Sequence, residues 1–393
     1  MKFSLRLGVL VSSFFSSLFW SLNLLLFLYT LLVYYLLYEV PIGHWIGGIF
    51  MISLPIAWAF NLFFILFWLL VKPWRALLPV LTLLIGIPFW RRTFTYNQPN
   101  DNSEKWPTLQ VMSYNVMGFN RYDVVDTQHP DDANAMIDWV LKEPSDVKCF
   151  QEFYNDDNSF VFRTIRRLER AGYPYYAILH PPDRKGMEKE PGKFIGVALF
   201  SRHPIVKRGE EIFDHFNGLV WADVKVNTDT VRVISLHLQS MGIRVGGMLD
   251  EEQRSRVKRN TQGVLRQLRQ GLTLRRNQIN RVEEYYRNSP HPVIICGDFN
   301  DTPYSFSYGK LRRILRNAFE DAGRGFGFSF NKAPGFLRID NQFYNARFLE
   351  PLNYITYREV KYSDHYPIMA KYAIRPREIS RDRRPKTHVE FDF

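Results

Sequence analysis

Hydrophobic residues dominate the first ninety positions of the chain, in three runs that few polar residues interrupt. Residues 7–38 and 45–71 contain no Asp, Glu, Lys or Arg, and each run exceeds the roughly 20 apolar residues that a membrane span needs. Residues 76–90 are shorter, and are consistent with a third span, a re-entrant segment or an interfacial helix. We therefore predict a membrane anchor of two or three helices over residues 1–92. Without charged residues in the spans, nothing indicates an ion or substrate pathway.

The basic residues in the short loops predict how these spans are oriented. Two basic residues precede the first run, the loop 39–44 has none, and Lys72 and Arg75 follow the second run. We therefore expect the N-terminus and the second loop in the cytoplasm. If the third run does not cross, the rest of the chain is cytoplasmic, and the pair Arg91–Arg92 favours that arrangement. We expect the third run to cross, which makes the chain an integral membrane protein with its later residues on the non-cytoplasmic side.

After the anchor, apolar and polar stretches alternate as they do in α/β proteins. The polar residues 93–107 predict a linker, 108–373 one folded domain, and 374–393 a basic, disordered tail. The predicted strands are 109–115, 146–152, 196–201, 220–226, 230–237, 293–297 and one starting at 355, and the predicted helices are 133–141, 160–171 and 251–287.

The predicted strands repeatedly end in a polar residue. The buried run 293–296 stops at Gly297 and is followed by Asp298 and Asn300, which places polar groups at the edge of a sheet, where active sites are commonly built. The other strand ends carry Asn115, Glu152, His237 and, last, Asp364 with His365. A turn, a solvated strand end or a buried core histidine would explain any one of them alone. Their recurrence predicts a site.

These residue types indicate metal-assisted hydrolysis of a phosphoester. Carboxylate and amide oxygens suit Mg²⁺, while an aspartate and two histidines can supply a base, stabilise phosphoryl charge and assist the leaving group. A His-Glu-x-x-His motif, a Gly-rich phosphate loop and a Gly-x-Ser-x-Gly elbow are absent from the sequence, which disfavours zinc proteases, NTPases and serine esterases. Cys149 and Cys296 lie in apolar runs and are predicted to be buried and unpaired.

The same segments closely resemble the motifs of the endonuclease/exonuclease/phosphatase superfamily, in that family's order and spacing. They are Ser-Tyr-Asn ending at 115, Phe-Gln-Glu ending at 152, Ser-Leu-His ending at 237, Gly-Asp-Phe-Asn at 297–300 and Ser-Asp-His at 363–365. The resemblance covers about residues 108–373. It implies an α/β fold, a four-layer sandwich of two mixed β-sheets flanked by helices. It also implies a phosphoesterase, in a family that includes nucleases, inositol polyphosphate phosphatases and neutral sphingomyelinases.

Matched motif by motif, the resemblance implies a metal site and a catalytic set. Glu152 and Asn115 would bind Mg²⁺, with Mn²⁺ as an alternative, and Asp364 would lie near the ion. The implied catalytic residues are His237, Asp298, Asn300, Asp340 and His365.

The family also implies a role for each catalytic residue. Asp298 would orient or deprotonate the attacking water, and Asn300 would hold the phosphoryl oxygens. His237 would bind the phosphate or assist the leaving group. His365, oriented by Asp340, would stabilise the pentacovalent transition state.

One segment departs from the family pattern. After Arg338-Ile-Asp340, where members usually have apolar strand residues, this chain has Asn341 and Gln342. We therefore expect the strand that carries Asp340 to be distorted or more exposed than usual.

The substrate is less well specified than the chemistry. The net charge is +12, and a basic stretch runs from Arg254 to Arg287; it could bind nucleic acid, form a solvated helix face or contact anionic lipid. We expect a membrane-anchored, Mg²⁺-dependent phosphodiesterase, with a nuclease as one form. The alternatives are a lipid phosphodiesterase or phosphomonoesterase on the same site, and a catalytically inactive binding or scaffold protein. The expected partners are a nucleic acid or phospholipid substrate and the membrane.

Overall fold

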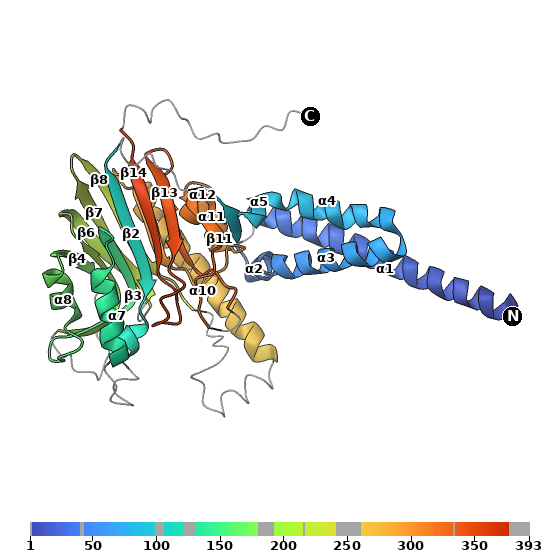
Figure 1. Cartoon of the computed structure of the whole chain (residues 1–393), viewed down its shortest axis with the longest axis horizontal. Coiled ribbons are helices and arrows are strands. Elements are labelled where there is room, and N and C mark those ends of the chain that lie inside the picture. The colour runs from blue at the N-terminus through green and yellow to red at the C-terminus, as the bar shows by residue number, and fades with distance from the viewer. Residues whose placement is uncertain are drawn as a thin grey trace. The chain divides into compact units, whose positions relative to one another are not determined.

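The computed structural model describes residues 2–39, 43–98, 106–121, 131–179, 192–214, 217–240, 261–332 and 335–376. The chain divides into two compact units (Figure 1). One comprises Met1–Arg92 with Tyr304–Gly309, and the other comprises Thr93–Pro303 with Lys310–Phe393. The predicted helical residues 251–260, residues 99–105 of the predicted linker and nearly all of the predicted tail lie outside the described residues.

The first unit is helical, and two of its helices are interrupted at specific residues. Its elements are α1 (Lys2–Glu39), α2 (Trp45–Ile52), α3 (Leu54–Val71), η1 (Pro73–Ala76), α4 (Leu77–Ile85) and α5 (Ile87–Trp90). The run 45–71, expected as one helix, breaks at Ser53 just before Pro55, and the third run breaks at Gly86 just before Pro88. A proline cannot donate the helical hydrogen bond and clashes with the preceding turn, so each helix restarts there.

Among the described residues of this unit, two helical segments are long and apolar enough to cross a membrane. They are Phe14–Glu39, with a mean hydropathy of 1.7, and Leu54–Val71, with 2.2. Polar side chains join them internally: Trp68 Nε1 donates to Asn23 Oδ1 at 3.1 Å, and Asn61 Nδ2 donates to Thr30 Oγ1 at 3.1 Å. These bonds fix the packing of α1 against α3.

The second unit contains two six-stranded sheets, ordered β10-β12-β9-β8-β7-β6 and β13-β14-β2-β3-β5-β4. The strands of the first sheet are β6 (Ile205–Asp214), β7 (Asn217–Val226), β8 (Asp229–His237), β9 (Val293–Asp298), β10 (Arg316–Asn317) and β12 (Asp340–Tyr344). Those of the second are β2 (Thr108–Asn115), β3 (Val147–Asp156), β4 (Tyr175–Ile178), β5 (Lys193–Ser201), β13 (Leu349–Thr356) and β14 (Ile368–Ile374). Both sheets are mixed, because β8 pairs with β9, and β2 with β3, in parallel.

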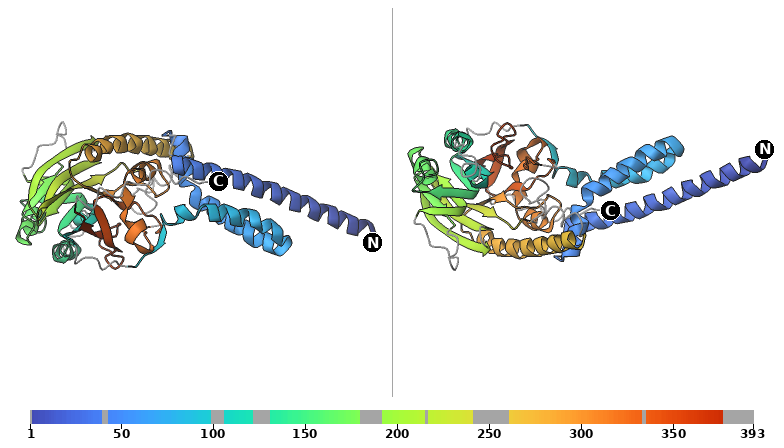
Figure 2. Two further views of the ribbon diagram at one scale, coloured as in Figure 1. Left: turned by 90° about the horizontal axis from the view of Figure 1, so that it is seen from above. Right: turned by 90° about the horizontal axis from the view of Figure 1, so that it is seen from below.

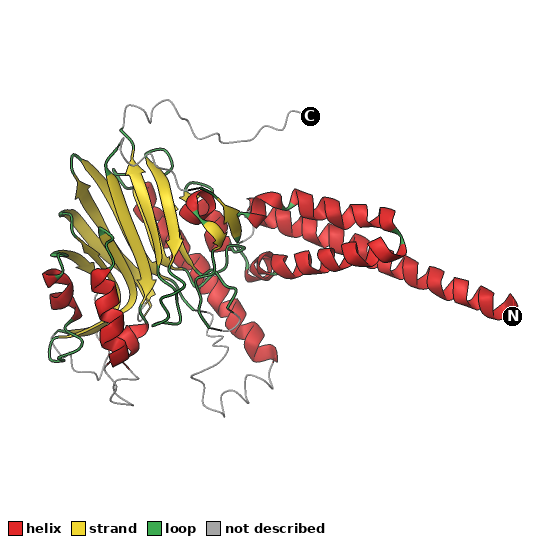
Figure 3. Cartoon of the chain, viewed as in Figure 1, coloured by secondary structure: helices red, strands yellow, loops and turns green. Residues whose placement is uncertain are grey.

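The two sheets pack face to face, and helices cover their outer sides (Figures 2 and 3). Wholly buried side chains from both sheets, among them Val111, Cys149, Val233 and Ile294, form the core between them. The helices α7 (Asp131–Lys142) and α8 (Thr164–Arg170) pack on the second sheet, and α10 (Thr261–Arg287) runs along the first. The predicted fold class is confirmed. Both cysteines are buried and free, as expected.

Several local expectations differ from the structure. The predicted linker contains β1 (Phe94–Tyr96), which pairs antiparallel with the distant β11 (Arg324–Phe326). The helix expected from residue 160 begins only at Thr164. Among the described residues after 93, the short helices η3 (Met117–Asn120), α11 (Phe306–Arg312) and α12 (Ala318–Ala322) were not predicted.

The expectation that the strand after Asp340 is distorted or exposed is wrong. Every residue of β12 is buried, and the strand pairs with β9 without a register shift. Gln342 Nε2 donates to the carbonyl of Val111 at 3.0 Å, and its Oε1 accepts from the Tyr372 hydroxyl at 3.0 Å. Because Val111 and Tyr372 belong to the other sheet, this glutamine links the two sheets, and its polar groups are satisfied where an apolar residue would normally pack.

Candidate active site

Three predicted site residues lie side by side at one end of the first sheet. His237 closes β8 and Asp298 closes the neighbouring β9, and the two are directly paired in the parallel register. Asp340 opens β12 and is paired with Asp298 from the other side. The register of three adjacent strands therefore brings an imidazole and two carboxylates to one edge, from positions far apart in the sequence.

The second sheet contributes Asn115 and Glu152 to the same place. Asn115 ends β2, and its carbonyl accepts from the Ser363 hydroxyl at 2.8 Å. Glu152 does not end its strand as predicted: β3 continues to Asp156, and the register shifts between Phe150 and Phe153. Glu152 has a φ of +52°, which is rare for a residue other than glycine. The β-bulge re-aims its side chain toward the site.

The carboxylate oxygen Oδ2 of Asp298 is the point where these side chains meet. Asn115 Nδ2 donates to it at 3.1 Å and Asn300 Nδ2 at 3.3 Å, while the Nε2 atoms of His237 and His365 lie 3.6 and 3.7 Å from it. The Asn115 amide also reaches Oε1 of Glu152 at 3.4 Å. Asp298 is almost fully buried, so these neighbours fix its orientation.

The end of β9 and the turn after it contain two unusual backbone conformations. Gly297 has a φ of +145°, and a Cβ there would lie 2.0 Å from the carbonyl oxygen of Leu236, so only glycine fits. Asn300 has a φ of +49°. Its backbone N–H donates to Asp298 Oδ1 at 2.8 Å, and its side chain donates to the Leu238 carbonyl at 2.9 Å. The turn thereby holds the amide of Asn300 against the carboxylate.

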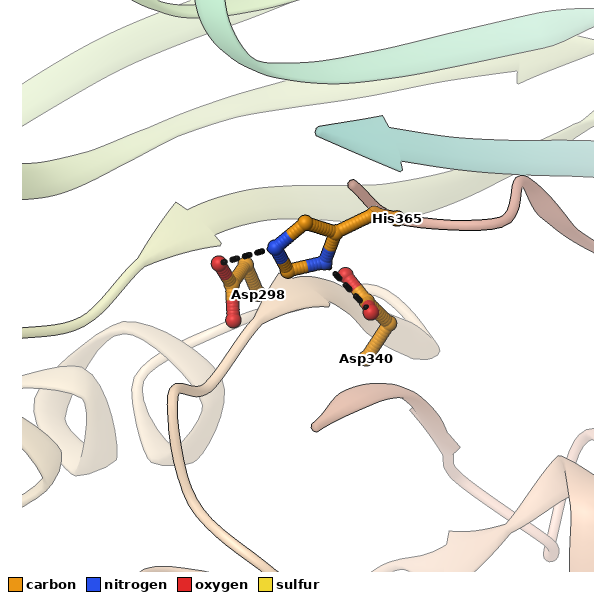
Figure 4. A group of neighbouring side chains, drawn as sticks. All are labelled: Asp298, Asp340 and His365. Atoms are coloured by element: carbon orange, nitrogen blue, oxygen red, sulfur yellow. Dashed lines mark hydrogen bonds and ion pairs between the residues drawn. The ribbon is translucent and has the colours of Figure 1, made fainter. Parts of the chain in front are cut away.

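His365 lies between Asp298 and Asp340 (Figure 4). Its Nδ1 is 2.9 Å from Asp340 Oδ2, and its Nε2 faces Asp298. Burial alone would lower the pKa of His365, but the carboxylates of Asp340, Asp298 and Asp364 outweigh burial and raise it well above its usual value. Burial likewise raises the pKa of Asp340, opposed by the imidazolium. At neutral pH we assign the proton to His365, which is then a cation facing the site.

The donor chemistry of the site fits a hard divalent cation. Glu152, Asp364 and the side-chain oxygen of Asn115 are oxygen ligands of the kind that Mg²⁺ and Mn²⁺ take. Asp298, Asp340 and His365 also place ligand atoms within 4.8 Å of one another. However, the bond from His365 to Asp340 and the proton on the imidazole make that trio an acid–base group. The carboxylates of Glu152 and Asp364 therefore remain the better candidates for the ion.

The other seven predicted site residues contact Asp298 directly or through one neighbour. Asp364 reaches the group through His365, with Oδ1 4.0 Å from His365 Nε2. Supporting residues were missed. Ser329 Oγ accepts from the backbone N–H groups of Ile339 and Asp340 at 3.1 and 3.0 Å, and Gln151 Nε2 donates to Ser113 and Ser235 in the two sheets. Buried serines give no distinctive sequence signal, although Gln151 belongs to a quoted motif.

Comparison with known proteins bears on both units. Residues 112–365 match the family described as Endonuclease/Exonuclease/phosphatase family, and residues 16–93 match one described as Domain of unknown function (DUF8431). The curated CCR4-Not complex 3'-5'-exoribonuclease subunit Ccr4 of Yarrowia lipolytica is 25% identical over 317 residues. That alignment covers 67% of this chain and 42% of the relative, so the chain spans about two fifths of the relative's length.

A solved structure shows the same fold. An endonuclease/exonuclease/phosphatase from Beutenbergia cavernae aligns with a TM-score of 0.50 at 16% identity, covering 68% of this chain and 72% of that one. The human Nocturnin catalytic domain aligns with a TM-score of 0.48 at 17% identity, covering 68% and 95%. On the family match, this chain belongs to the endonuclease/exonuclease/phosphatase family of hydrolases, which act on phosphoester bonds.

Proposed function

We propose that this chain is a membrane-anchored phosphodiesterase that requires Mg²⁺ or Mn²⁺. The observation that carries the proposal is the convergence of two histidines and two side-chain amides on one buried carboxylate, Asp298. A carboxylate in that setting can accept a proton from water, and cationic or amide donors around it can stabilise a phosphoryl group as negative charge develops.

Each side chain has a distinct task in this proposal. Asp298 orients the water and takes its proton. Asn300 donates to a phosphoryl oxygen, and His365 places its positive charge against the transition state while Asp340 fixes its ring. His237 contacts the phosphate or supports the leaving oxygen. The ion, held by Glu152, Asn115 and Asp364, would supply Lewis-acid stabilisation of the phosphoryl and leaving oxygens.

The proposed substrate is a nucleic acid or a phospholipid. A nucleic acid is supported by the likeness to a relative named as an exoribonuclease subunit. A phospholipid is supported by the two apolar helices, which would keep the site near a bilayer. A binding protein without activity is disfavoured, because such a protein would have no need to retain the whole set of polar residues around Asp298.

The packing of the helical unit supports a third crossing and a non-cytoplasmic catalytic domain. The helix α4 packs against both α1 and α3, which suits a segment that returns through the bilayer. Single cysteines at the exposed positions Glu359 and Lys72 would test this with a membrane-impermeant maleimide in sealed cells, since both native cysteines are buried. Labelling of Glu359→Cys and not of Lys72→Cys is expected; the reverse would place the domain in the cytoplasm.

Substrate class is tested with the full chain in detergent. Single-stranded RNA, single-stranded DNA, sphingomyelin and a phosphoinositide are each incubated with Mg²⁺ and then with chelator, beside Asp298→Ala. Metal-dependent cleavage of RNA or DNA alone supports the nuclease, and cleavage of a lipid alone supports the second class. A folded protein that cleaves none of these, nor a simple diester, would contradict the proposed activity.

A further inference from the structure

Arg275 is wholly buried in the middle of α10, although it belongs to the basic stretch predicted to face solvent, lipid or nucleic acid. It belongs to the helix that lies along the first sheet (Figure 2). Burying a guanidinium destabilises the fold unless the charge is paired. The partners of Arg275 therefore indicate its role.

The guanidinium joins the two chain segments that leave the ends of β8 and β9. Nη1 donates to the carbonyl of Gln239 at 3.1 Å, and Nε lies 3.3 Å from Oδ2 of the buried Asp301. One turn further along α10, Gln278 Oε1 accepts from the backbone N–H of Gln239 at 2.9 Å. The helix therefore holds both backbone polar groups of Gln239 and the side chain of Asp301.

These two segments carry the reacting groups. Gln239 comes two residues after His237, and Asp301 directly follows Asn300. Between them, the carbonyl of Leu238 accepts from the Asn300 side chain at 2.9 Å, and its N–H donates to the Asp298 carbonyl at 2.9 Å. Asn300 is held in a left-handed conformation, which persists only where the surroundings impose it. Arg275 contacts Gln239 on one side of these bonded residues and Asp301 on the other.

We propose that Arg275 is a positioning residue for hydrolysis, which sets the Asn300 amide and the His237 ring against Asp298 by clamping Asp301 and Gln239. This inference rests on the proposed phosphodiesterase activity. Within the described part of the chain, Arg275 bonds to Gln239 and Asp301 and to neither Asp298 nor a site histidine. Asp301 balances its charge, so we infer that Arg275 acts through geometry. Its loss should lower kcat and leave KM for a small diester nearly unchanged, because small displacements of reacting groups cost turnover.

The chain offers a matched control for the loss of a buried ion pair. Arg232, near the middle of β8, is also buried and binds Asp223, with Nε 2.7 Å from Oδ1. It is five positions before His237 along the strand, about 17 Å at the usual rise per residue. Arg275→Met and Arg232→Met both remove a buried guanidinium from a carboxylate, but only the first touches the loops of the site.

The experiment measures kcat and KM for bis(p-nitrophenyl) phosphate, per folded molecule, for the full chain and the two variants. We expect Arg275→Met to lower kcat at least about tenfold, Arg275→Lys to restore part of it, and Arg232→Met to change stability and not kcat. We also expect the effects of Arg275→Met and Asn300→Ala to combine to less than their product, since both disrupt one arrangement.

Equal kcat in the two methionine variants, or fully multiplicative effects with Asn300→Ala, would overturn the inference. If Arg275→Met does not fold, Asp301→Asn and Arg275→Lys decide it, and unchanged kcat in both would overturn it. Absence of wild-type turnover on every substrate would instead contradict the proposed function, so the two failures are distinguishable.

Discussion

The Nδ1 atom of His365 lies 2.9 Å from Oδ2 of Asp340, and both side chains are almost fully buried. The aspartate comes from the start of β12 and the histidine from the loop before β14. This bond fixes the imidazole ring so that its other nitrogen faces Asp298. The pKa of His365 is well above its usual value: burial opposes that rise, and the carboxylates, Asp340 first, produce it.

This relationship predicts a pH dependence. His365 stays charged through neutral pH, so activity should fall only as the pH rises through its raised pKa. Replacing Asp340 with Asn removes the largest raising influence, so the alkaline limb of kcat/KM should move to lower pH while the acidic limb stays in place. The measurement is a pH–rate profile of both proteins. Asp223→Asn, a buried aspartate elsewhere, is the control; an unmoved alkaline limb in Asp340→Asn would contradict the role of the pair.

Glu152 is predicted to be the main ligand of the ion. Glu152→Gln should weaken Mg²⁺ binding by about a hundredfold or more, because it removes a charged oxygen and keeps the shape. Titration calorimetry with MgCl₂ measures this without turnover. Asp156→Asn, at the end of the same strand, should bind as wild type does. If Glu152→Gln binds Mg²⁺ with wild-type affinity, Glu152 is not the main ligand of the ion.

The burial of Lys148 predicts that the free energy of unfolding rises with pH. It is fully buried and bonds to Glu143 and to the Val140 carbonyl, and burial lowers its pKa from 10.5 to about 8. Between these values the unfolded chain holds more protons than the folded one, so the free energy of unfolding should increase with pH, by up to about 3 kcal/mol. Denaturant unfolding from pH 8 to 10.5 should show this gain in wild type and not in Lys148→Met. If the free energy of unfolding changes with pH in the same way in both proteins, this prediction is wrong.

Gln342 is predicted to act in stability and not in turnover. Gln342→Leu restores an apolar residue but leaves the Val111 carbonyl and the Tyr372 hydroxyl without their partner, at a cost of about 1–3 kcal/mol. The kcat per folded molecule should not change. Unfolding measurements and kinetics on Gln342→Leu, with Tyr372→Phe as a milder comparison, test this. A variant as stable as wild type would show that the bonds contribute nothing.

The sequence predicted much of the sandwich because strand and helix periodicity is local. The runs before Asn115, His237 and Asp298 are strongly apolar, and each becomes a strand with those residues at its end. The conformation of Glu152 could not be predicted in this way, because a bulge inside a continuing strand depends on how β3 pairs with β5. The pairing of β1 with β11 depends on residues far apart in the sequence.

The buried polar residues were the hardest to interpret from sequence. From the sequence, Gln342 predicts a distorted strand, whereas in the structure it bonds to the other sheet. Arg275 has the same sequence pattern as its exposed basic neighbours, but it is buried. Whether a polar residue faces solvent or a buried partner depends on the tertiary structure, which helical or strand periodicity alone does not determine.

The most direct test of the central claim is hydrolysis of bis(p-nitrophenyl) phosphate by the full chain, with Asp298→Ala as its counterpart. The account predicts turnover that needs Mg²⁺ or Mn²⁺, stops with chelator and falls by about a thousandfold or more in the variant, with both proteins equally folded. Equal turnover in wild type and Asp298→Ala would contradict the account, because the residue on which the whole site converges would then take no part in the reaction.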